Sequence, residues 1–369
     1  MKHQYHLYGS DSSMFTAKVR GYMNYKGLDY ELKKIGLYDL AVRLPKKIGA
    51  SAMPALKDSA GEWFGDSTEI IEELERRHPF RSIGTVSARQ MIAVMLFEAW
   101  VDESWMVISL HTRWSYQENI PGIRKEMANA MIPIGPQWLK NAVISKALET
   151  RIRESMPKVG IIPEQIETLE KWMVSLLDLL EAHFSKHAYL FGGRPTIADY
   201  SLFGPLFAHL NRDPWPKREL MSSRPNLQTY SERLFRGDDP VGDLPTDGSI
   251  PDTLDPIFRI IFSEFFPLVR KTVTAVEELV TNKGFQPGDS LPRGVDKITS
   301  PMGDSTFTKG SVTYTLWMMQ RIQTYYQNLS ETDKQDVANW FKEMGQSDLL
   351  EMNLGPKLER DGLSTRLAK

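Results

Sequence analysis

Two short polar stretches contain the side chains that could do chemistry. The first is a turn of small polar residues after a predicted strand, and it holds Ser10, Ser12 and Ser13. The second holds Asp66 and Ser67, directly before an apolar stripe at helical spacing. The first N–H groups of a helix have no intrahelical acceptor, so a helix start can bind an anion. Both stretches therefore predict anion-binding helix starts, although ordinary turns and N-caps use the same residue types.

The elements expected around these stretches alternate in type. We predict a strand over 5–8, a helix over 14–26 and a second strand over 30–35. A hairpin that turns at 59–61 and a further helix follow, which gives the order βαβ and then ββα. Pro54 is expected at a strand edge, where its missing N–H costs no ladder bond, and it is also a candidate for a cis peptide.

The stretch Met53-Pro-Ala-Leu56, followed by Asp66-Ser67, resembles the glutathione-binding half of the glutathione transferase family. That family has Val-Pro-x-Leu with a cis proline, a hairpin, and Glu-Ser-x-Ala-Ile at the start of a helix. Here Met53 replaces the valine, Asp66 replaces the glutamate, and Thr68-Glu69 replaces x-Ala. The resemblance implies an α/β thioredoxin-like N-terminal domain over residues 1–79.

Glutathione is the co-substrate that this resemblance implies. In the family, the residue before the cis proline, here Met53 before Pro54, pairs its backbone with the cysteinyl part of glutathione. Asp66 and Ser67 would hold the γ-glutamyl end. Lys46 or Lys47 could meet the glycine carboxylate, although a solvated loop charge is the plainer interpretation of either lysine.

The serine turn is the candidate catalytic site. A free cysteine thiol, with a pKa of about 8.5, is mostly protonated at neutral pH, and a helix N-terminus and a hydroxyl donor favour its thiolate. Aligning Lys18-Val19-Arg20 with the family puts Ser13 on the position of the catalytic serine or cysteine of theta- and omega-like classes. Ser12 and Ser10 stay as alternatives, and N-capping is a structural explanation for all three serines.

A second motif supports an all-helical domain over residues 86–236. Long helices are expected over 87–114, 137–156 and 163–187. Thr196-Ile-Ala-Asp199 resembles the family's Ser/Thr-Ile-Ala-Asp, with Thr196 capping a helix and Asp199 bonding back. Its role would be structural. The likeness covers about residues 4–236, and an apolar pocket in this domain would bind the electrophile.

The sequence continues past a polar linker into an extension over residues 250–369. Apolar stripes over 257–268 and 313–326 and a capped helix after Ser330 predict a mostly helical region. The stretch 285–309 has turn signals and little periodicity. Ordinary transferases end before this region, so whether the chain forms the usual homodimer is left open.

Composition excludes several classes of protein. The 369 residues carry a formal charge of −2, which gives no electrostatic case for nucleic acid, and no apolar run could span a membrane. The absence of a signal-type N-terminus favours a cytoplasmic protein. There is no cysteine, which disfavours a thiol–disulfide reductase. His183 and His187 have the spacing of metal ligands but no evident third ligand, so surface histidines are expected there.

Two functional hypotheses remain. The first is a transferase-like enzyme that activates the glutathione thiol for attack on a small electrophile. The second is a non-catalytic protein of the same fold that binds a partner. Resemblance of fold does not by itself establish activity.

Overall fold

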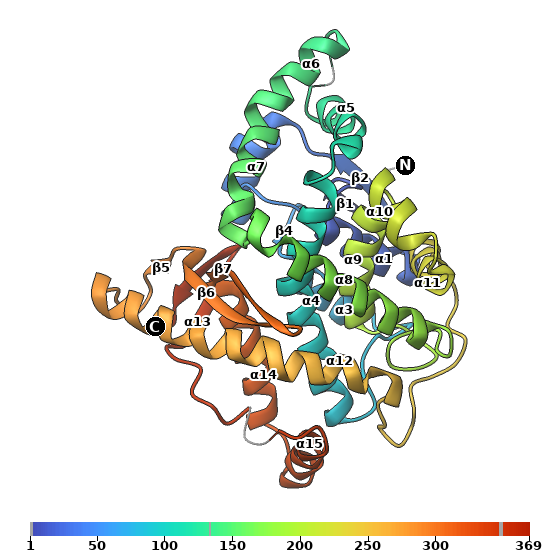
Figure 1. Ribbon diagram of the computed structural model, residues 1–369, viewed down its shortest axis with the longest axis vertical. Coiled ribbons are helices and arrows are strands. Elements are labelled where there is room, and N and C mark those ends of the chain that lie inside the picture. The colour runs from blue at the N-terminus through green and yellow to red at the C-terminus, as the bar shows by residue number, and fades with distance from the viewer. Residues whose placement is uncertain (1–2, 133, 347–349) are drawn as a thin grey trace. The chain divides into compact units, whose positions relative to one another are not determined.

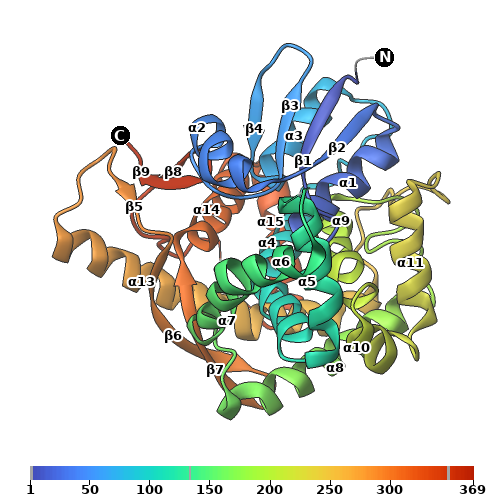
Figure 2. The ribbon, with the colours of Figure 1, turned by 90° about the horizontal axis from the view of Figure 1, so that it is seen from above.

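A four-stranded sheet organises the N-terminal part of the chain (Figure 2). The computed structural model describes residues 3–132, 134–346 and 350–369. The strand order is β2-β1-β3-β4; β1 and β2 are parallel, and the other pairs are antiparallel. The strands are β1 Tyr5–Gly9, β2 Tyr30–Lys34, β3 Ala55–Asp58 and β4 Trp63–Gly65. The helices of this part are α1 Met14–Lys26, α2 Leu44–Ile48, preceded by a turn of π-helix over Asp39–Arg43, and α3 Ser67–Arg77.

The sheet and its helices follow from the pattern of buried residues. Along β1, Tyr5, Leu7 and Gly9 are buried and alternate with more exposed residues, as a half-buried strand requires. Helix α1 ends because Gly27 adopts φ 63°, a left-handed conformation that only glycine adopts at little cost. The predicted thioredoxin-like order βαβ, ββα is confirmed.

The chain divides into two compact units, each made of three segments. Unit 1 contains residues 1–82, 106–157 and 200–239; unit 2 contains residues 83–105, 158–199 and 240–369. Helix α4, Ala88–Trp114, therefore contributes its first part to unit 2 and its last part to unit 1. The division into three domains along the chain stays a prediction.

The helices expected after the first domain are present (Figure 1). Helix α4 matches 87–114, and the helical stretch 137–155 and helix α8 match the other two. The helices that the sequence did not predict include α5 and α11. The helices after α4 are α5 Ile120–Met131, α6 Gln137–Ile144, a π-helical turn Ser145–Glu149, α7 Thr150–Ser155, α8 Pro163–Phe184, α9 Ile197–Pro205, α10 Pro214–Pro216 and α11 Pro225–Arg236.

At the start of α9, Asp199 bonds back to Thr196 as predicted, and the Thr196 hydroxyl donates to the same carboxylate. The Asp199 carboxylate accepts hydrogen bonds from the Thr196 N–H at 2.8 Å and from the Leu190 N–H at 2.8 Å. Asp199 is fully buried, so losing it would leave these donors unpaired.

The expectation of two surface histidines is wrong for His183, which is buried and bonds Thr253 Oγ1 at 2.7 Å.

The region after residue 236 contains helices and two small sheets. The stretch 285–309, expected to be irregular, contributes to a hairpin that lies along α13. One face of the hairpin buries Ile298 and Phe307, while the other face keeps polar residues exposed, which hides the alternation in the sequence. The elements are α12 Asp255–Ile260, a π-helical turn Ile261–Phe265, α13 Phe266–Lys283, β5 Ser290–Leu291, β6 Gly294–Met302, β7 Ser305–Val312, α14 Thr313–Gln327, α15 Glu331–Glu343, β8 Leu358–Asp361 and β9 Ser364–Leu367.

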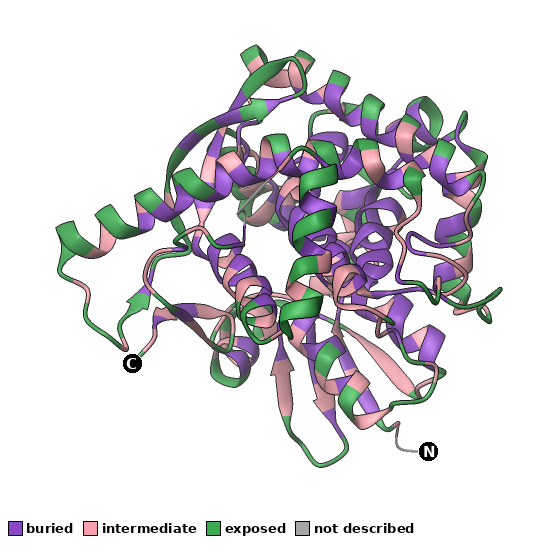
Figure 3. Ribbon diagram, turned by 90° about the horizontal axis from the view of Figure 1, so that it is seen from below, coloured by how far each residue is buried: buried purple, intermediate pink, exposed green. Residues whose placement is uncertain are grey.

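Residues far apart in the sequence make up the core of unit 2. The ring centroids of Phe97 and Phe258 are 6.4 Å apart, and Trp172 Nε1 donates to Glu264 at 2.7 Å. The buried Glu103 carboxylate pairs with Lys309. Individual helices carry both buried and exposed residues (Figure 3). The apolar stripe over 257–268 therefore packs onto α4 and α8 within this unit, and α14 packs against α13.

Candidate functional site

The register of the sheet in unit 1 brings the candidate residues to one edge. Tyr8 of β1 pairs with Ala55 of β3, and Ala55 pairs with Gly65 of β4. Beyond this row, β1 leads into the serine turn, β3 is preceded by Met53–Pro54, and β4 leads into Asp66. The three stretches that the sequence singled out therefore lie side by side at the carboxyl end of β1.

The Met53–Pro54 peptide bond is cis, as the sequence suggested. Pro54 is buried directly before β3, and β3 lies between β1 and β4, so the proline is not on an edge strand. Its missing N–H still costs no ladder bond, because the pairing of β3 begins at Ala55. Met53 therefore lies two residues before the row in which Ala55 pairs with Tyr8.

Asp66 has an unusual backbone conformation at the start of α3. Its φ is 65° and its ψ is 130°, which is rare for a residue other than glycine, and it is only 7% exposed. Its Oδ1 accepts from the Thr68 N–H at 2.9 Å, so Asp66 is the N-cap of α3. Such a conformation costs on the order of 1–3 kcal/mol and persists only where the surroundings impose it; it clusters at binding sites. Ser67 beside it is 4% exposed.

A buried lysine connects the starts of the two helices. Lys18 of α1 donates from Nζ to Thr68 Oγ1 at 3.0 Å, and both residues are almost fully buried. Sequence reasoning used Lys18 only for alignment and missed this role. A lysine within a helix gives no sign in the sequence that its head group turns inward.

The hydroxyls of the serine turn are engaged in different ways. Ser13 is the N-cap of α1, and its Oγ accepts from the Thr16 N–H at 3.3 Å. Its own hydroxyl hydrogen therefore remains a donor for a bound group. The hydroxyls of Ser10 and Ser12 are 2.8 Å apart and bond each other. One of these two hydroxyls donates to the other, and the accepting hydroxyl keeps its hydrogen. The assignment of Ser13, with Ser12 and Ser10 as alternatives, stays a prediction.

A cation other than Lys46 lies near the end of β1. Lys46 and Lys47 are both exposed on α2. The guanidinium carbon of Arg43 lies 5.7 Å from the centre of the Tyr8 ring, and Arg43 also pairs with Asp39 at 2.6 Å. The assignment of Lys46 to the glycine carboxylate stays a prediction.

Arg113, near the end of α4, reaches the serine turn, which was not predicted from the sequence. Its Nη1 donates to the Ser12 carbonyl at 2.6 Å, and its Nε donates to Asp213 at 2.8 Å. Both charged side chains are buried. Nothing local in His-Thr-Arg-Trp distinguishes this arginine from a solvated one.

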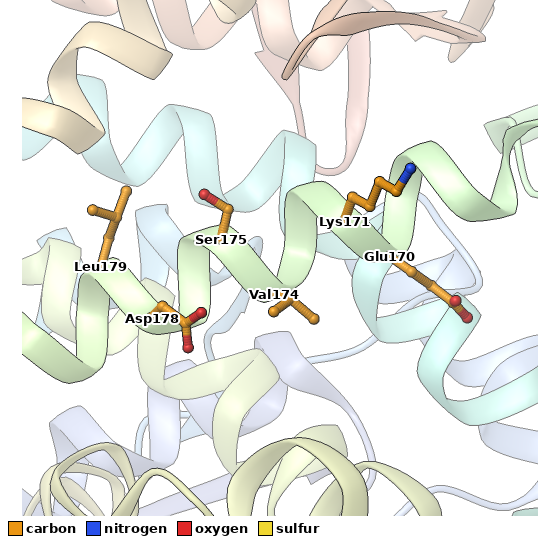
Figure 4. A pocket seen from close by; sticks show the side chains of 6 residues that line it. All are labelled: Glu170, Lys171, Val174, Ser175, Asp178 and Leu179. Atoms are coloured by element: carbon orange, nitrogen blue, oxygen red, sulfur yellow. The ribbon is translucent and has the colours of Figure 1, made fainter.

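Two surface hollows elsewhere lack such an arrangement. One, of about 630 Å³ in unit 2, is lined by side chains from the outer face of α8 alone, and they point in different directions (Figure 4). The other, of about 320 Å³ in unit 1, is lined by residues that include Phe207, Arg212, Lys217 and Phe235. Within the described residues no cluster of His, Cys, Asp and Glu could hold a metal ion, and no helix is long and apolar enough to cross a membrane.

Comparisons with known proteins agree with the architecture. Residues 7–82 match the glutathione S-transferase N-terminal domain, and residues 163–233 match the glutathione S-transferase C-terminal domain. A curated relative, an isoprene-epoxide glutathione S-transferase from Rhodococcus, is 24% identical over 232 residues, which are 61% of this chain and 92% of the relative.

Similar solved structures include a β-etherase from Sphingobium, with 21% identity, TM-score 0.45, and 63% of this chain and 94% of that chain covered. A glutathione S-transferase from Methylobacterium radiotolerans, solved with glutathione sulfonate, has 20% identity, TM-score 0.39, and 67% and 99% coverage. Taken with the two domain matches, the sheet and its helices show that the chain belongs to the glutathione S-transferase family, with an additional region beyond residue 233.

Proposed function

We propose that the protein is a glutathione transferase that activates the glutathione thiol for attack on a small electrophile. The observation that carries the proposal is the meeting of the serine turn, Met53–Pro54 and Asp66 at one edge of the sheet. Membership of the family supports glutathione as the co-substrate.

Each part of glutathione has a candidate partner there. The Asp66 carboxylate and the Ser67 hydroxyl would hold the γ-glutamyl end, since an ammonium group favours a buried carboxylate. The backbone of Met53 would pair with the cysteinyl unit. Lys46 or Arg43 would meet the glycine carboxylate. The positive φ of Asp66 supports a binding role, because strained backbone conformations of this kind cluster at functional sites.

The start of α1 would favour the thiolate. The Ser13 hydroxyl would donate to sulfur, and the helix N-terminus adds a favourable potential. The thiolate sulfur then forms a bond to an electrophilic carbon while the bond from that carbon to its leaving group breaks. With an epoxide, the class named in the curated Rhodococcus relative, the ring oxygen leaves carbon and takes a proton to become a hydroxyl.

A second candidate is a non-catalytic binding protein of the same fold. The observation that favours it is that Ser13 Oγ already serves α1 as its N-cap acceptor, which explains the residue without catalysis. The extra region beyond residue 233 gives such a protein additional surface for a partner.

Calorimetric titration with glutathione, followed by a product assay with a small epoxide, distinguishes these candidates. The proposal expects binding and a thioether product, both lost or weakened in the double variant Asp66→Ala/Ser67→Ala. Binding without product would favour the second candidate. No binding by the folded wild-type protein would overturn the glutathione assignment.

A further inference from the structure

The side chain of Arg113 bonds three residues from the two other segments of unit 1. Its Nη1 donates to the Ser12 carbonyl at 2.6 Å, and its Nη2 donates to the Ala208 carbonyl. Asp213 accepts from both Nε and Nη2, at 2.8 and 3.3 Å, in a two-pronged pair. Arginine suits this task because its planar fork can hold a carboxylate and further acceptors at once.

The hydrogen bond to Ser12 fixes the peptide that leads into Ser13. That peptide's carbonyl is held by Arg113, and its N–H donates to the Ser10 carbonyl at 3.1 Å. A planar peptide bonded at both ends cannot rotate without breaking one bond. The Ser13 side chain is fixed in turn by the Thr16 N–H at 3.3 Å.

Burial makes this arrangement costly to rearrange. The side chains of Arg113 and Asp213 are 5% and 3% exposed, so neither charge has water as a ready alternative partner. Losing the guanidinium would free the Ser12 carbonyl to turn and would leave the Asp213 carboxylate without its partner charge. The orientation of the serine turn thus depends on a residue about a hundred positions further along the chain.

We propose that Arg113, held by Asp213, is a positioning residue that sets the direction of the Ser13 hydroxyl toward the glutathione sulfur. The inference rests on the proposed function, because it assumes that Ser13 stabilises a thiolate. Arg113 itself touches no reacting atom in this proposal. It acts through the Ser12–Ser13 peptide, so its effect requires the hydroxyl that it positions.

The test measures the pH midpoint of thiolate absorbance of bound glutathione in four proteins: wild type, Arg113→Lys, Ser13→Ala and the double variant. Lysine keeps the charge but cannot bridge the same acceptors. We expect Arg113→Lys to raise the midpoint and to lower kcat roughly 10- to 100-fold, the scale of an ångström-level misplacement. The KM for glutathione should change much less. In the Ser13→Ala background, Arg113→Lys should cause no further shift of the midpoint.

The matched control is Arg224→Lys, which changes another buried arginine of unit 1 that donates to the Leu220 carbonyl, away from the turn. It should leave the midpoint unchanged. If Arg113→Lys does not fold, Asp213→Asn keeps the arginine and weakens its hold, and it should shift the midpoint in the same direction. An unchanged midpoint in a folded Arg113 or Asp213 variant, or additive shifts in the double variant, would overturn the inference. Failure of the wild type to bind or ionise glutathione would instead refute the proposed function.

Discussion

Lys18 and Thr68 are joined by a hydrogen bond of 3.0 Å from Nζ to Oγ1, although 50 positions separate them. The bond ties the first turn of α3 to the side of α1, and both partners are buried. The two partners of this bond stay in place in a variant that changes the charge of Asp66 and keeps its size. Glutathione binding and folding can therefore be compared in the same variant.

Asp66→Asn is expected to weaken glutathione binding in a protein that still folds. Asparagine caps helices and tolerates positive φ about as well as aspartate, but it carries no charge for an ammonium group. Losing a hydrogen bond to a charged group costs about 1.5–3 kcal/mol, which is roughly a 10- to 100-fold loss of affinity. Calorimetric titration of both proteins measures the affinity for glutathione, and thermal melting checks that both are folded. Equal affinity in wild type and variant would remove Asp66 from the γ-glutamyl site.

Ser13→Gly is expected to raise the pH at which bound glutathione forms its thiolate. Glycine at an N-cap costs only a few tenths of a kcal/mol, whereas alanine costs about 0.5–2 kcal/mol. Comparing Ser13→Gly with Ser13→Ala by ultraviolet absorbance therefore separates loss of the hydroxyl from loss of the cap. A shift only in Ser12→Ala or Ser10→Ala would move the catalytic assignment to that serine, and no shift in any variant would favour a binding protein.

Truncation after Arg236 is expected to give an insoluble protein or one with a markedly lower Tm. The truncated chain would lack Phe258, which contacts the ring of Phe97, and Glu264, which accepts a hydrogen bond from Trp172. It would also lack Lys309, the ion-pair partner of the buried Glu103. Breaking a buried ion pair alone costs about 3–5 kcal/mol, a large share of the stability of a domain. A truncated protein that is soluble, melts as before and binds glutathione equally well would show instead that the missing part is an independent module.

Acid should destabilise the protein through His183. Burial, together with the charge of the stacked His187, lowers the pKa of His183 to about 3. The folded state then binds fewer protons than the unfolded state, so this stability is present above about pH 6.5 and is lost as pH falls toward 3. The loss amounts to about 5 kcal/mol once the pH is below 3. Unfolding by urea between pH 4 and 7 should show a flatter pH dependence for His183→Gln, and identical slopes would contradict the assignment.

Local patterns in the sequence predicted much of this molecule. The caps at Ser13, Thr196 and Ser330 were predictable because each is made by side chains within three residues of a helix start. The cis bond at Met53–Pro54 was expected because Met53-Pro-Ala-Leu56 resembles the family's Val-Pro-x-Leu. Arg113 was not predictable, because its partners lie about a hundred positions away on both sides.

Other errors have the same physical origin. The hairpin of β6 and β7 was missed because its exposed face is as polar as a loop, and its buried face has partners elsewhere in the sequence. His183 was predicted to be a surface residue because its hydrogen-bond partner, Thr253, lies 70 positions away and cannot be inferred from the local sequence. In each case, contacts between distant segments decide the outcome.

The way unit 2 is assembled has a consequence for synthesis of the protein in the cell. Its first two segments, residues 83–105 and 158–199, leave the ribosome before any part of 240–369 exists. At ordinary translation rates, that last segment takes on the order of ten seconds to make. During this interval Phe97 and Trp172 lack the partners that cover them, and such exposed apolar surface is what chaperones bind. Slowing translation after residue 240 should therefore lower the yield of soluble protein.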